Sequence, residues 1–302
     1  PTEKTRATAD KSRTRSGYRR GAMVSPPTSH PRIGGAIPRF SWRTTLAILA
    51  ILGLTGWSVA GTEFDLVKLL TNTGPIERFV SEMFPPDISA ATLRATFTGI
   101  LETFQMSFLG ALLGAAAAFP LAALGTHEPP TVGASRGERV SRAVPYHLSR
   151  FVLNVFRSVP DILWALVFVV ALGLGPFPGT LALAVHSAGI LGKLYSEALE
   201  AAPARPVEAL RATGADALQT LLFGRLPQTM SGFISLTLYQ WECNIRSAAI
   251  LGFVGAGGIG QQILISMNLF NYPKVATLVG ATMIVVLLVD RFSAAVRQRL
   301  VY

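Results

Sequence analysis

The sequence predicts an all-α polytopic membrane protein, on the basis of its composition, its hydropathy and the placement of its charges. Half of its 302 residues are hydrophobic and only 15% are charged, whereas charged residues make up roughly 25% of an ordinary soluble domain. The mean hydropathy of +0.43 excludes a disordered chain and argues against a water-soluble enzyme. The single cysteine, Cys243, excludes an intrachain disulfide and any zinc site built on cysteine pairs.

Six apolar stretches have the length that a helix needs to cross about 30 Å of hydrocarbon. The first is not expected to be a cleaved signal peptide, because it follows more than forty residues of basic sequence and lacks a convincing cleavage site. The second contains Gly110-x-x-x-Gly114 and then Ala118, a ridge of small residues that permits close contact with another helix. The six predicted transmembrane helices are residues 43–61, 99–124, 151–174, 177–195, 230–254 and 275–292.

The lysine and arginine residues predict the orientation of these helices. With the N-terminus in the cytoplasm, 21 of them fall in segments on the cytoplasmic side and only 4 in segments on the outer side. Cytoplasmic loops of membrane proteins carry this excess of positive charge. We therefore predict a multi-pass protein of the plasma (inner) membrane with both termini in the cytoplasm.

The basic character of the chain is concentrated in its N-terminal tail. Residues 1–43 carry a net charge of +8, so the rest of the chain contributes only +2 to the total of +10. The Ser, Thr, Pro and Gly content of this tail is typical of disorder, and its charge favours a topology signal that also contacts anionic membrane lipid. Nucleic acid is not an expected partner, because the basic residues are not regularly interleaved with aromatic ones.

The chain divides into four predicted segments. Residues 1–42 form a basic, disordered cytoplasmic tail, and residues 43–98 contain the first transmembrane helix and an outer segment. Residues 99–295 form a core of five transmembrane helices, and residues 296–302 form a cytoplasmic end.

An amphipathic helix is predicted within the outer segment. Its apolar residues recur at i, i+3, i+4 and i+7, which is the spacing of one helix face. Such a helix is expected to lie in the membrane interface and to end at Pro85-Pro86. The residues of this face are Ile76, Phe79, Val80 and Met83.

Residues 196–228 form a polar loop between the fourth and fifth predicted transmembrane helices. Pro206 suits the first turn of a helix, and Glu208 in that turn is favoured by the helix dipole. We predict a stiff helix over residues 205–222. A short helix in such a loop either packs on the protein's own helix ends or docks onto a partner, and the spacing alone leaves both alternatives open.

The same loop resembles the cytoplasmic loop of ABC importer permeases. Their motif reads Glu-Ala-Ala, three residues, Gly, nine residues, Ile, one residue and Leu-Pro. Glu208-Ala209, Gly214 and Leu226-Pro227 match this spacing residue for residue, while Leu210 replaces the second alanine and Gly224 the isoleucine. The resemblance implies a type I ABC importer permease fold, and it implies that residues 205–222 are the coupling helix that contacts a separate ATPase.

Further motifs resemble the phosphonate-uptake branch of these permeases, and the similarity covers residues of about 95–295. It implies a permease subunit for phosphonate, phosphite or phosphate that forms a dimer with a second copy of itself. It also implies an ATPase dimer that holds ATP and Mg²⁺ and an extracytoplasmic substrate-binding protein, with no cofactor or metal bound by this chain. The motifs are Leu153-Asn154-x-x-Arg157-Ser158-Val159-Pro160-Asp161, His186-Ser187-Ala188-Gly189, Gly192-Lys193-Leu194-Tyr195-x-Glu197, Tyr239-x-x-Glu242-x-Asn244-x-Arg246 and Val254-Gly255-Ala256-Gly257-Gly258-Ile259-Gly260.

Ionisable side chains within the predicted transmembrane helices are costly in a bilayer, and this makes them candidates for function. The fifth helix contains Glu242, Asn244 and Arg246, of which the first and last are four residues apart and can pair. Arg157 and Asp161 repeat this spacing, with Pro160 able to kink the helix between them. These residues predict either structural ion pairs or a path for an oxyanion. In the second case we expect Arg246 to contact the anion, because a guanidinium binds such oxygens through two parallel hydrogen bonds.

Two patterns argue against other functions. Gly255-x-Gly257-x-x-Gly260 fits a dinucleotide-binding fingerprint, but it follows a transmembrane helix and no acidic residue lies about twenty residues further on, so we expect a turn or a re-entrant segment. No phosphate-binding loop of the Gly-x-x-x-x-Gly-Lys-Ser/Thr type is present, so we expect ATP hydrolysis in another chain. A secondary carrier or channel for a small anion, or a membrane-embedded enzyme, stays open as an alternative.

Overall fold

The computed structural model describes residues 41–62, 64–71, 73–127 and 136–300, and the chain separates into two units at residues 69 and 70. The first unit contains α1 (Trp42–Gly61) and the beginning of α2 (Leu66–Thr71). No side chain of α1 is buried within this first unit. The first predicted transmembrane helix is therefore observed, whereas residues 1–40 of the predicted tail lie outside the described residues.

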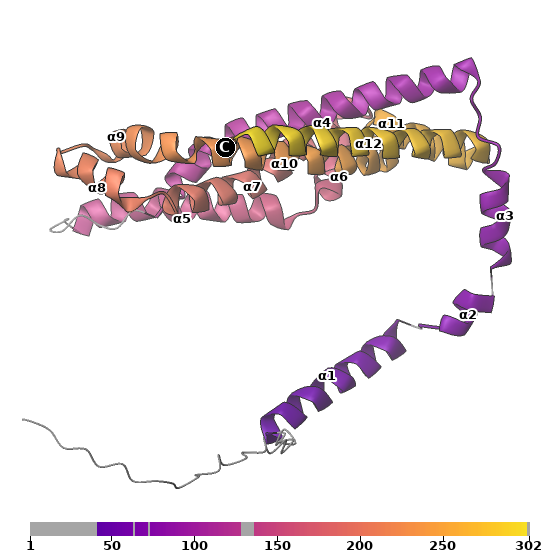
Figure 1. Cartoon of the computed structure of the whole chain (residues 1–302), viewed down its shortest axis with the longest axis horizontal. Coiled ribbons are helices and arrows are strands. Elements are labelled where there is room, and N and C mark those ends of the chain that lie inside the picture. Colours follow the sequence, from indigo (N-terminus) through magenta and orange to yellow (C-terminus); the bar gives the residue numbers. More distant parts are fainter. Residues whose placement is uncertain (1–40, 63, 72, 128–135, 301–302) are drawn as a thin grey trace, which may run out of the picture. The chain divides into compact units, whose positions relative to one another are not determined.

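The second unit is a bundle of helices (Figure 1). Two short helices, α8 (Ala204–Ala212) and α9 (Ala217–Gln219), lie at one end of this bundle, and α4 (Ala90–Leu124) and α12 (Tyr272–Leu300) begin at the other end (Figure 1). Its helices are α3 (Gly74–Glu82), α4 (Ala90–Leu124), α5 (Arg136–Ser158), α6 (Asp161–Leu172), α7 (Pro176–Glu200), α8 (Ala204–Ala212), α9 (Ala217–Gln219), a π-helix (Thr220–Arg225), α10 (Leu226–Leu251), a 3₁₀-helix (Gly252–Val254), α11 (Gly258–Asn268) and α12 (Tyr272–Leu300).

Not every predicted transmembrane helix is a single straight helix. Among the described residues, α1, α4 and α12 are each long and apolar enough to cross a membrane, and two bent helix pairs raise the number to five. The remaining predicted span, residues 177–195, corresponds to α7, which packs against α4, α5, α6 and α10 and buries thirteen of its residues. Because its neighbours rather than lipid cover α7, it can be less apolar than a lipid-facing helix. The membrane-spanning character of the protein is thus evident, and the count of six stays a prediction.

The predicted third transmembrane helix is broken. Helices α5 and α6 meet at an angle of 89°, and the break falls at Val159 and Pro160, where proline cannot donate the hydrogen bond that continues a helix. The side chains of His186 and Trp164 donate hydrogen bonds to the carbonyl oxygens of Val159 and Phe156, at 3.2 Å in both cases. The kink predicted at Pro160 is confirmed, and two side chains satisfy carbonyl groups near it.

The predicted ridge of small residues on α4 brings this helix into close contact with α7. A Cβ atom added to Gly110 would lie 2.7 Å from the Cβ atom of Leu183, and one added to Gly114 would lie 2.6 Å from that of Ser187. Ala118, one turn further on, is fully buried. Small residues let helix backbones approach each other and gain van der Waals contact in a membrane, so α4 and α7 form the central helix pair.

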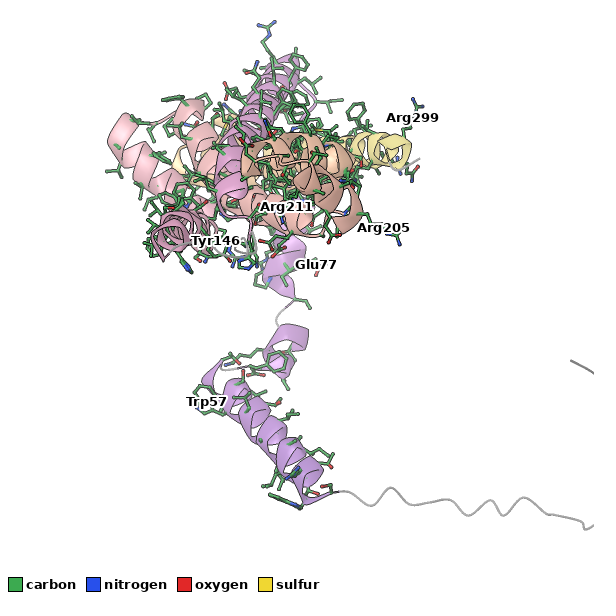
Figure 2. The ribbon with its side chains drawn as sticks, turned by 90° about the vertical axis from the view of Figure 1, so that its left-hand side faces the viewer. Trp57, Glu77, Tyr146, Arg205, Arg211 and Arg299 are labelled. Carbon is green, nitrogen blue, oxygen red and sulfur yellow. The ribbon has the colours of Figure 1, made fainter. Side chains whose placement is uncertain are left out.

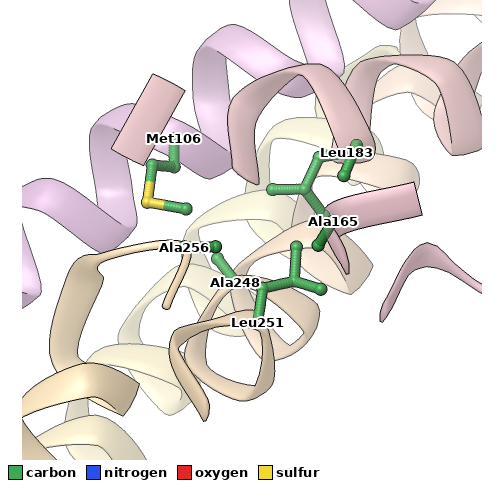
Figure 3. Packing of buried hydrophobic residues seen from close by; sticks show 7 residues of the cluster. Met106, Ala165, Leu183, Ala248, Leu251 and Ala256 are labelled. Atoms are coloured by element: carbon green, nitrogen blue, oxygen red, sulfur yellow. The ribbon is translucent and has the colours of Figure 1, made fainter. Parts of the chain in front are cut away.

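A compact hydrophobic core lies where α4, α6, α7 and α10 meet the glycine-rich turn (Figure 3). Its members are mostly small, which lets five segments approach one another closely. The buried residues of this core are Met106, Ala165, Ala182, Leu183, Ala248, Leu251 and Ala256.

The glycine-rich segment after α10 forms the expected turn and close backbone contact. Gly257 and Gly258 have φ angles of +81° and +72°, in the region that glycine adopts without strain. The amide of Gly258 donates a hydrogen bond to Oε2 of Glu102 at 3.1 Å, and the amide of Ile259 donates one to Oγ1 of Thr103 at 2.9 Å. Side chains of α4 thus cap the first turn of α11, and the expected turn is confirmed.

The amphipathic helix predicted before α4 is confirmed as α3. It ends at Glu82, shortly before Pro85. The ring of Phe79 contacts the edge of Tyr272 at a centroid distance of 5.3 Å, and Met83 packs against the buried cluster around Ile263. One side of this helix therefore rests on the beginning of α12 and its neighbours.

Asp87 joins the beginnings of α4 and α12. Its amide donates to the carbonyl oxygen of Pro273 at 3.0 Å, and Oγ1 of Thr277 donates to its carbonyl oxygen at 2.8 Å. Its carboxylate accepts hydrogen bonds from Oγ1 of Thr92 and, at 2.9 Å, from the amide of Ser89. The Thr92 hydroxyl above all, and then the Ser89 amide, lower the pKa of Asp87 below its ordinary value of 3.8.

This shift predicts a pH-dependent contribution of Asp87 to stability. Because the pKa in the folded state is below that in the unfolded state, the contribution is present above the unfolded pKa and is lost as the pH falls through the folded pKa. We expect Asp87→Asn to lower the melting temperature of the purified protein by a few degrees at pH 7. Below about pH 4 the same substitution is expected to lower the melting temperature less. Thermal unfolding of both proteins from pH 7 to pH 3 measures this, and equal differences at every pH would contradict it.

Candidate functional site

The predicted coupling helix is shorter than the sequence indicates. We expected one helix over residues 205–222, but α8 ends at Ala212 and the chain turns at Gly214 before α9 begins. Gly214 has a φ angle of +86°, and its amide donates to the carbonyl oxygen of Arg211 at 3.0 Å. A glycine in this left-handed conformation ends a helix, so the expectation of a single stiff helix is wrong.

A new helical segment starts directly after this turn. The carboxylate of Asp216 accepts a hydrogen bond from the amide of Gln219 at 2.7 Å, and the side chain of Gln219 accepts one from the amide of Asp216 at 3.0 Å. This reciprocal capping box satisfies amide groups that lack partners at a helix start. Helix α9 then leads through the π-helix into α10 without a further loop. The loop is thus a helical hairpin with Gly214 at its turn.

The residues of the loop motif fall on two sides of this hairpin. Glu208 and Ala209 of α8 are exposed, and Glu208 has no hydrogen bond or ion pair with any described residue. Figure 2 views the bundle from this end and shows Arg205 of the same helix extending outward. Leu226 packs against the buried cluster around Tyr195, and Pro227 lies in the first turn of α10. The first half of the motif is therefore accessible to a partner, while the second half begins a helix of the bundle.

The pairing predicted for Glu242 and Arg246 is confirmed and is part of a larger network. Nη1 of Arg246 lies 3.9 Å from Oε1 of Glu242 and 3.4 Å from Oδ2 of Asp290 on α12. Oε2 of Glu242 accepts a hydrogen bond from Arg297 at 2.9 Å. These four side chains carry two charges of each sign, and they join α10 to α12. The side chain of Arg246 keeps 44% of its surface exposed, the largest fraction in the network.

The sequence reasoning missed Asp290 and Arg297. Asp290 is the only acidic residue in the predicted span 275–292, which is the signal that could have identified it. Its pairing with Arg246 depends on the register of α10 against α12, which sequence spacing does not specify.

Asn244 does not join this network, although it lies between Glu242 and Arg246 in the sequence. It is 2% exposed and faces α7, where its Nδ2 donates to Oγ of Ser187 at 2.9 Å. Nε2 of Gln240 donates to Oδ1 of Asn244 at 3.0 Å. Residues two apart on a helix point in different directions, so grouping Asn244 with the two charged residues is wrong. These three polar side chains satisfy one another inside the bundle, which secures α7 to α10.

Arg157 and Asp161 do not form the expected ion pair among the described residues. Nε of Arg157 donates to Oδ1 of Asn154 at 3.1 Å, and Oδ1 of Asp161 accepts from the amide of Ile162 at 2.9 Å. The two residues lie on opposite sides of the break between α5 and α6. The i, i+4 rule holds only within a continuous helix, which explains why this pairing is wrong. Arg157 itself is exposed.

Comparisons with known proteins agree with this architecture. Residues 131–302 match the profile of the family described as binding-protein-dependent transport system inner membrane component. The chain is 35% identical over 265 residues to the phosphite transport system permease protein PtxC of Stutzerimonas stutzeri, covering 85% of this chain and 90% of that protein. It is 33% identical over 245 residues to the phosphate-import permease protein PhnE of Mycolicibacterium smegmatis, covering 81% of this chain and 43% of that protein.

A solved structure shows the same fold. The chain is similar to a chain of the MetNI methionine ABC transporter in an inward-facing conformation, with a TM-score of 0.60 and 24% identity. The similarity covers 70% of this chain and 99% of that chain. The family match covers more than half of the sequence, and the sequence relatives extend it over most of the rest. This multi-pass membrane protein therefore belongs to the binding-protein-dependent transport system inner membrane component family, the permease subunits of ABC importers.

Proposed function

We propose that this chain is the membrane-spanning permease subunit of an ATP-driven importer for a phosphorus oxyanion, namely phosphonate, phosphite or phosphate. The observation that carries this proposal is its 35% sequence identity to the PtxC permease over 85% of its length. The helical hairpin of the loop supports it, because α8 offers an exposed Glu208 at one end of the bundle, and this side chain pairs with no residue that the structure describes.

In the proposed assembly, two copies of the chain form the translocation path, and a separate ATPase dimer with ATP and Mg²⁺ contacts α8. An extracytoplasmic binding protein delivers the anion at the opposite end. In this proposal both termini of the chain lie in the cytoplasm. The charge distribution of 21 to 4 supports this orientation, and α12 runs toward the end of the bundle that carries α8 (Figure 1).

Arg246 is the proposed contact for the anion inside the membrane. Its guanidinium is the more exposed cation of the network and can bind an oxyanion through two parallel hydrogen bonds. Asp290 and Glu242 keep it from holding the anion too tightly to release it. Arg157 at the α5–α6 break is a second candidate, while Asn244 and Asp161 are bound to other groups of the protein.

Reconstitution of the full complex tests this proposal. We expect the tagged chain to co-purify with an ATPase subunit. Liposomes that contain both proteins are expected to take up phosphite, phosphate or methylphosphonate only when the binding protein is present and ATP is supplied on the side of the membrane that carries the ATPase. Uptake driven by an ion gradient in the absence of ATPase would instead establish the alternative, a secondary carrier or channel. Ligand titration of the binding protein then decides among the three anions.

A further inference from the structure

The contact between α8 and the rest of the protein is concentrated at the π-helix. Among the described elements, the π-helix Thr220–Arg225 is the one against which α8 packs most extensively. Val207 of α8 is 6% exposed and Leu210 is half-buried, whereas Glu208 and Ala209 point outward. The apolar side of α8 therefore lies on the π-helix, and Glu208 and Ala209 stay exposed to a partner.

Leu210 fits against a position without a side chain. A Cβ atom added to Gly224 would lie 3.1 Å from Cδ1 of Leu210 and 3.7 Å from Cγ2 of Val207. Gly224 itself is buried, and its carbonyl oxygen accepts a hydrogen bond from the side chain of Gln228. A larger residue at position 224 would therefore displace Leu210, and a smaller one at position 210 would leave a gap.

The two departures from the loop motif are the two sides of this one contact. The motif has alanine where this chain has Leu210, and it has isoleucine where this chain has Gly224. In this chain the large side chain between α8 and the π-helix is Leu210 of α8. In the motif it would be the isoleucine at the position of Gly224. Since Leu210 and Gly224 meet in space, the two departures fall within one contact.

The π-helix that α8 contacts is continuous with α10, the helix that carries Arg246 of the charged network. The π-helix continues into α10 at Leu226 without an intervening loop, and Arg246 lies 20 residues further along, about 30 Å at 1.5 Å per residue. A π-helix is a rare and less regular geometry, often found at functional positions. A displacement of α8 therefore acts on the base of the helix that carries Arg246.

We infer that the contact of Leu210 with Gly224 transmits the movement of α8 to α10, and that these two residues position the coupling loop as a matched pair. This inference rests on the proposed function, because it takes ATP-driven movement of a partner as the source of the displacement. It assigns to Leu210 and Gly224 a role in coupling ATP hydrolysis to transport, distinct from the contact with the ATPase itself.

A double-mutant cycle tests the inference in the complete complex with ATPase and binding protein. The variants are Leu210→Ala, Gly224→Ile and Leu210→Ala/Gly224→Ile, and the readout is anion taken up per ATP hydrolysed in liposomes. The transported probe is whichever of phosphite, phosphate and methylphosphonate the wild-type complex takes up fastest. Leu93→Ala, a loss of the same side chain from an exposed position at the start of α4, is the matched control.

We expect each single variant to hydrolyse ATP at a near wild-type rate and to lower uptake per ATP about fivefold, equivalent to about 1 kcal/mol of coupling. The double variant is expected to return to within about twofold of the wild type, because isoleucine at 224 fills the space that Leu210 leaves. A purely structural role would lower the melting temperature while leaving uptake per ATP unchanged.

Two results overturn the inference. One is uptake per ATP that stays at the wild-type value in both single variants, and the other is a double variant whose loss equals the product of the single losses. If Gly224→Ile does not accumulate, Gly224→Val takes its place in the cycle, since its branched side chain also meets Leu210 and partly fills the space that Leu210→Ala leaves. Failure of the wild-type chain to bind an ATPase would overturn the proposed function instead, and co-purification reveals this before uptake is measured.

Discussion

Gly114→Leu is expected to destabilise the folded protein strongly. A single Cβ atom at this position would lie 2.6 Å from Cβ of Ser187 and 3.0 Å from the carbonyl oxygen of Ala184, so a leucine forces α4 away from α7. Overpacking of a core costs about 1–3 kcal/mol and sometimes more, and here the leucine would also press on Ser187, whose hydroxyl accepts hydrogen bonds from Asn244 and Gln240. We expect the free energy of unfolding to fall by about 3 kcal/mol or more.

The yield and melting temperature of detergent-purified protein measure this loss. Gly114→Ala is expected to show a smaller decrease, because the added methyl group alone requires less displacement. Gly280→Leu on α12 is the control, since no atom lies within 4 Å of a Cβ atom built there. A melting temperature of Gly114→Leu within about 2 °C of the wild type corresponds to a loss of less than about 1 kcal/mol in the free energy of unfolding. That result would show that the packing of α4 on α7 does not require glycine at position 114.

Arg246→Ala is expected to reduce uptake strongly while the complex still assembles. Hydrogen bonds to a charged group contribute about 1.5–3 kcal/mol each, so loss of one such bond to the anion lowers uptake about 10-fold to 150-fold. The same variant, however, also leaves Asp290 without its partner cation, whereas Glu242 keeps its hydrogen bond to Arg297. Arg246→Ala by itself therefore does not separate contact with the anion from neutralisation of Asp290.

The double variant Arg246→Ala/Asp290→Ala separates these two effects. If Arg246 contacts the anion, uptake stays low in the double variant, because the cation is still missing. If Arg246 only neutralises Asp290, removal of both charges restores uptake toward the wild-type rate. Asp290→Ala alone frees the guanidinium and is expected to slow release of the anion, visible as a lower maximal rate at an unchanged or lower KM. Restored uptake in the double variant would exclude the proposed anion contact.

The sequence reasoning was most accurate where a pattern depends on neighbouring residues of one helix. The spacing of Ile76, Phe79, Val80 and Met83 predicted α3, because one face of a helix repeats every 3.6 residues. Pro160 predicted the break between α5 and α6, because a proline removes a backbone donor wherever it occurs. Gly110 and Gly114 predicted close packing of α4, although the sequence did not say which helix would be its neighbour.

The same reasoning failed where spacing was extended across a break or between faces. Arg157 and Asp161 are four residues apart, but the chain bends by 89° between them and their side chains bind other groups. Asn244 has the same depth as its charged neighbours and yet faces α7. The prediction of one stiff helix over residues 205–222 did not anticipate that Gly214 adopts a positive φ angle. This conformation ends α8 and turns the chain so that α8 packs on the π-helix.

By itself, the sequence determined the class of the protein, the approximate positions of its helices and the loop motif that identifies its family. These properties follow from hydropathy, charge and local periodicity, each of which depends only on residues that are near one another in the sequence. Only the tertiary structure decided that Arg246 meets Asp290, that Arg297 meets Glu242 and that Leu210 rests on Gly224. Such contacts depend on the relative register and rotation of separate helices, and these are set by the packing of side chains across the whole bundle, which no local pattern contains.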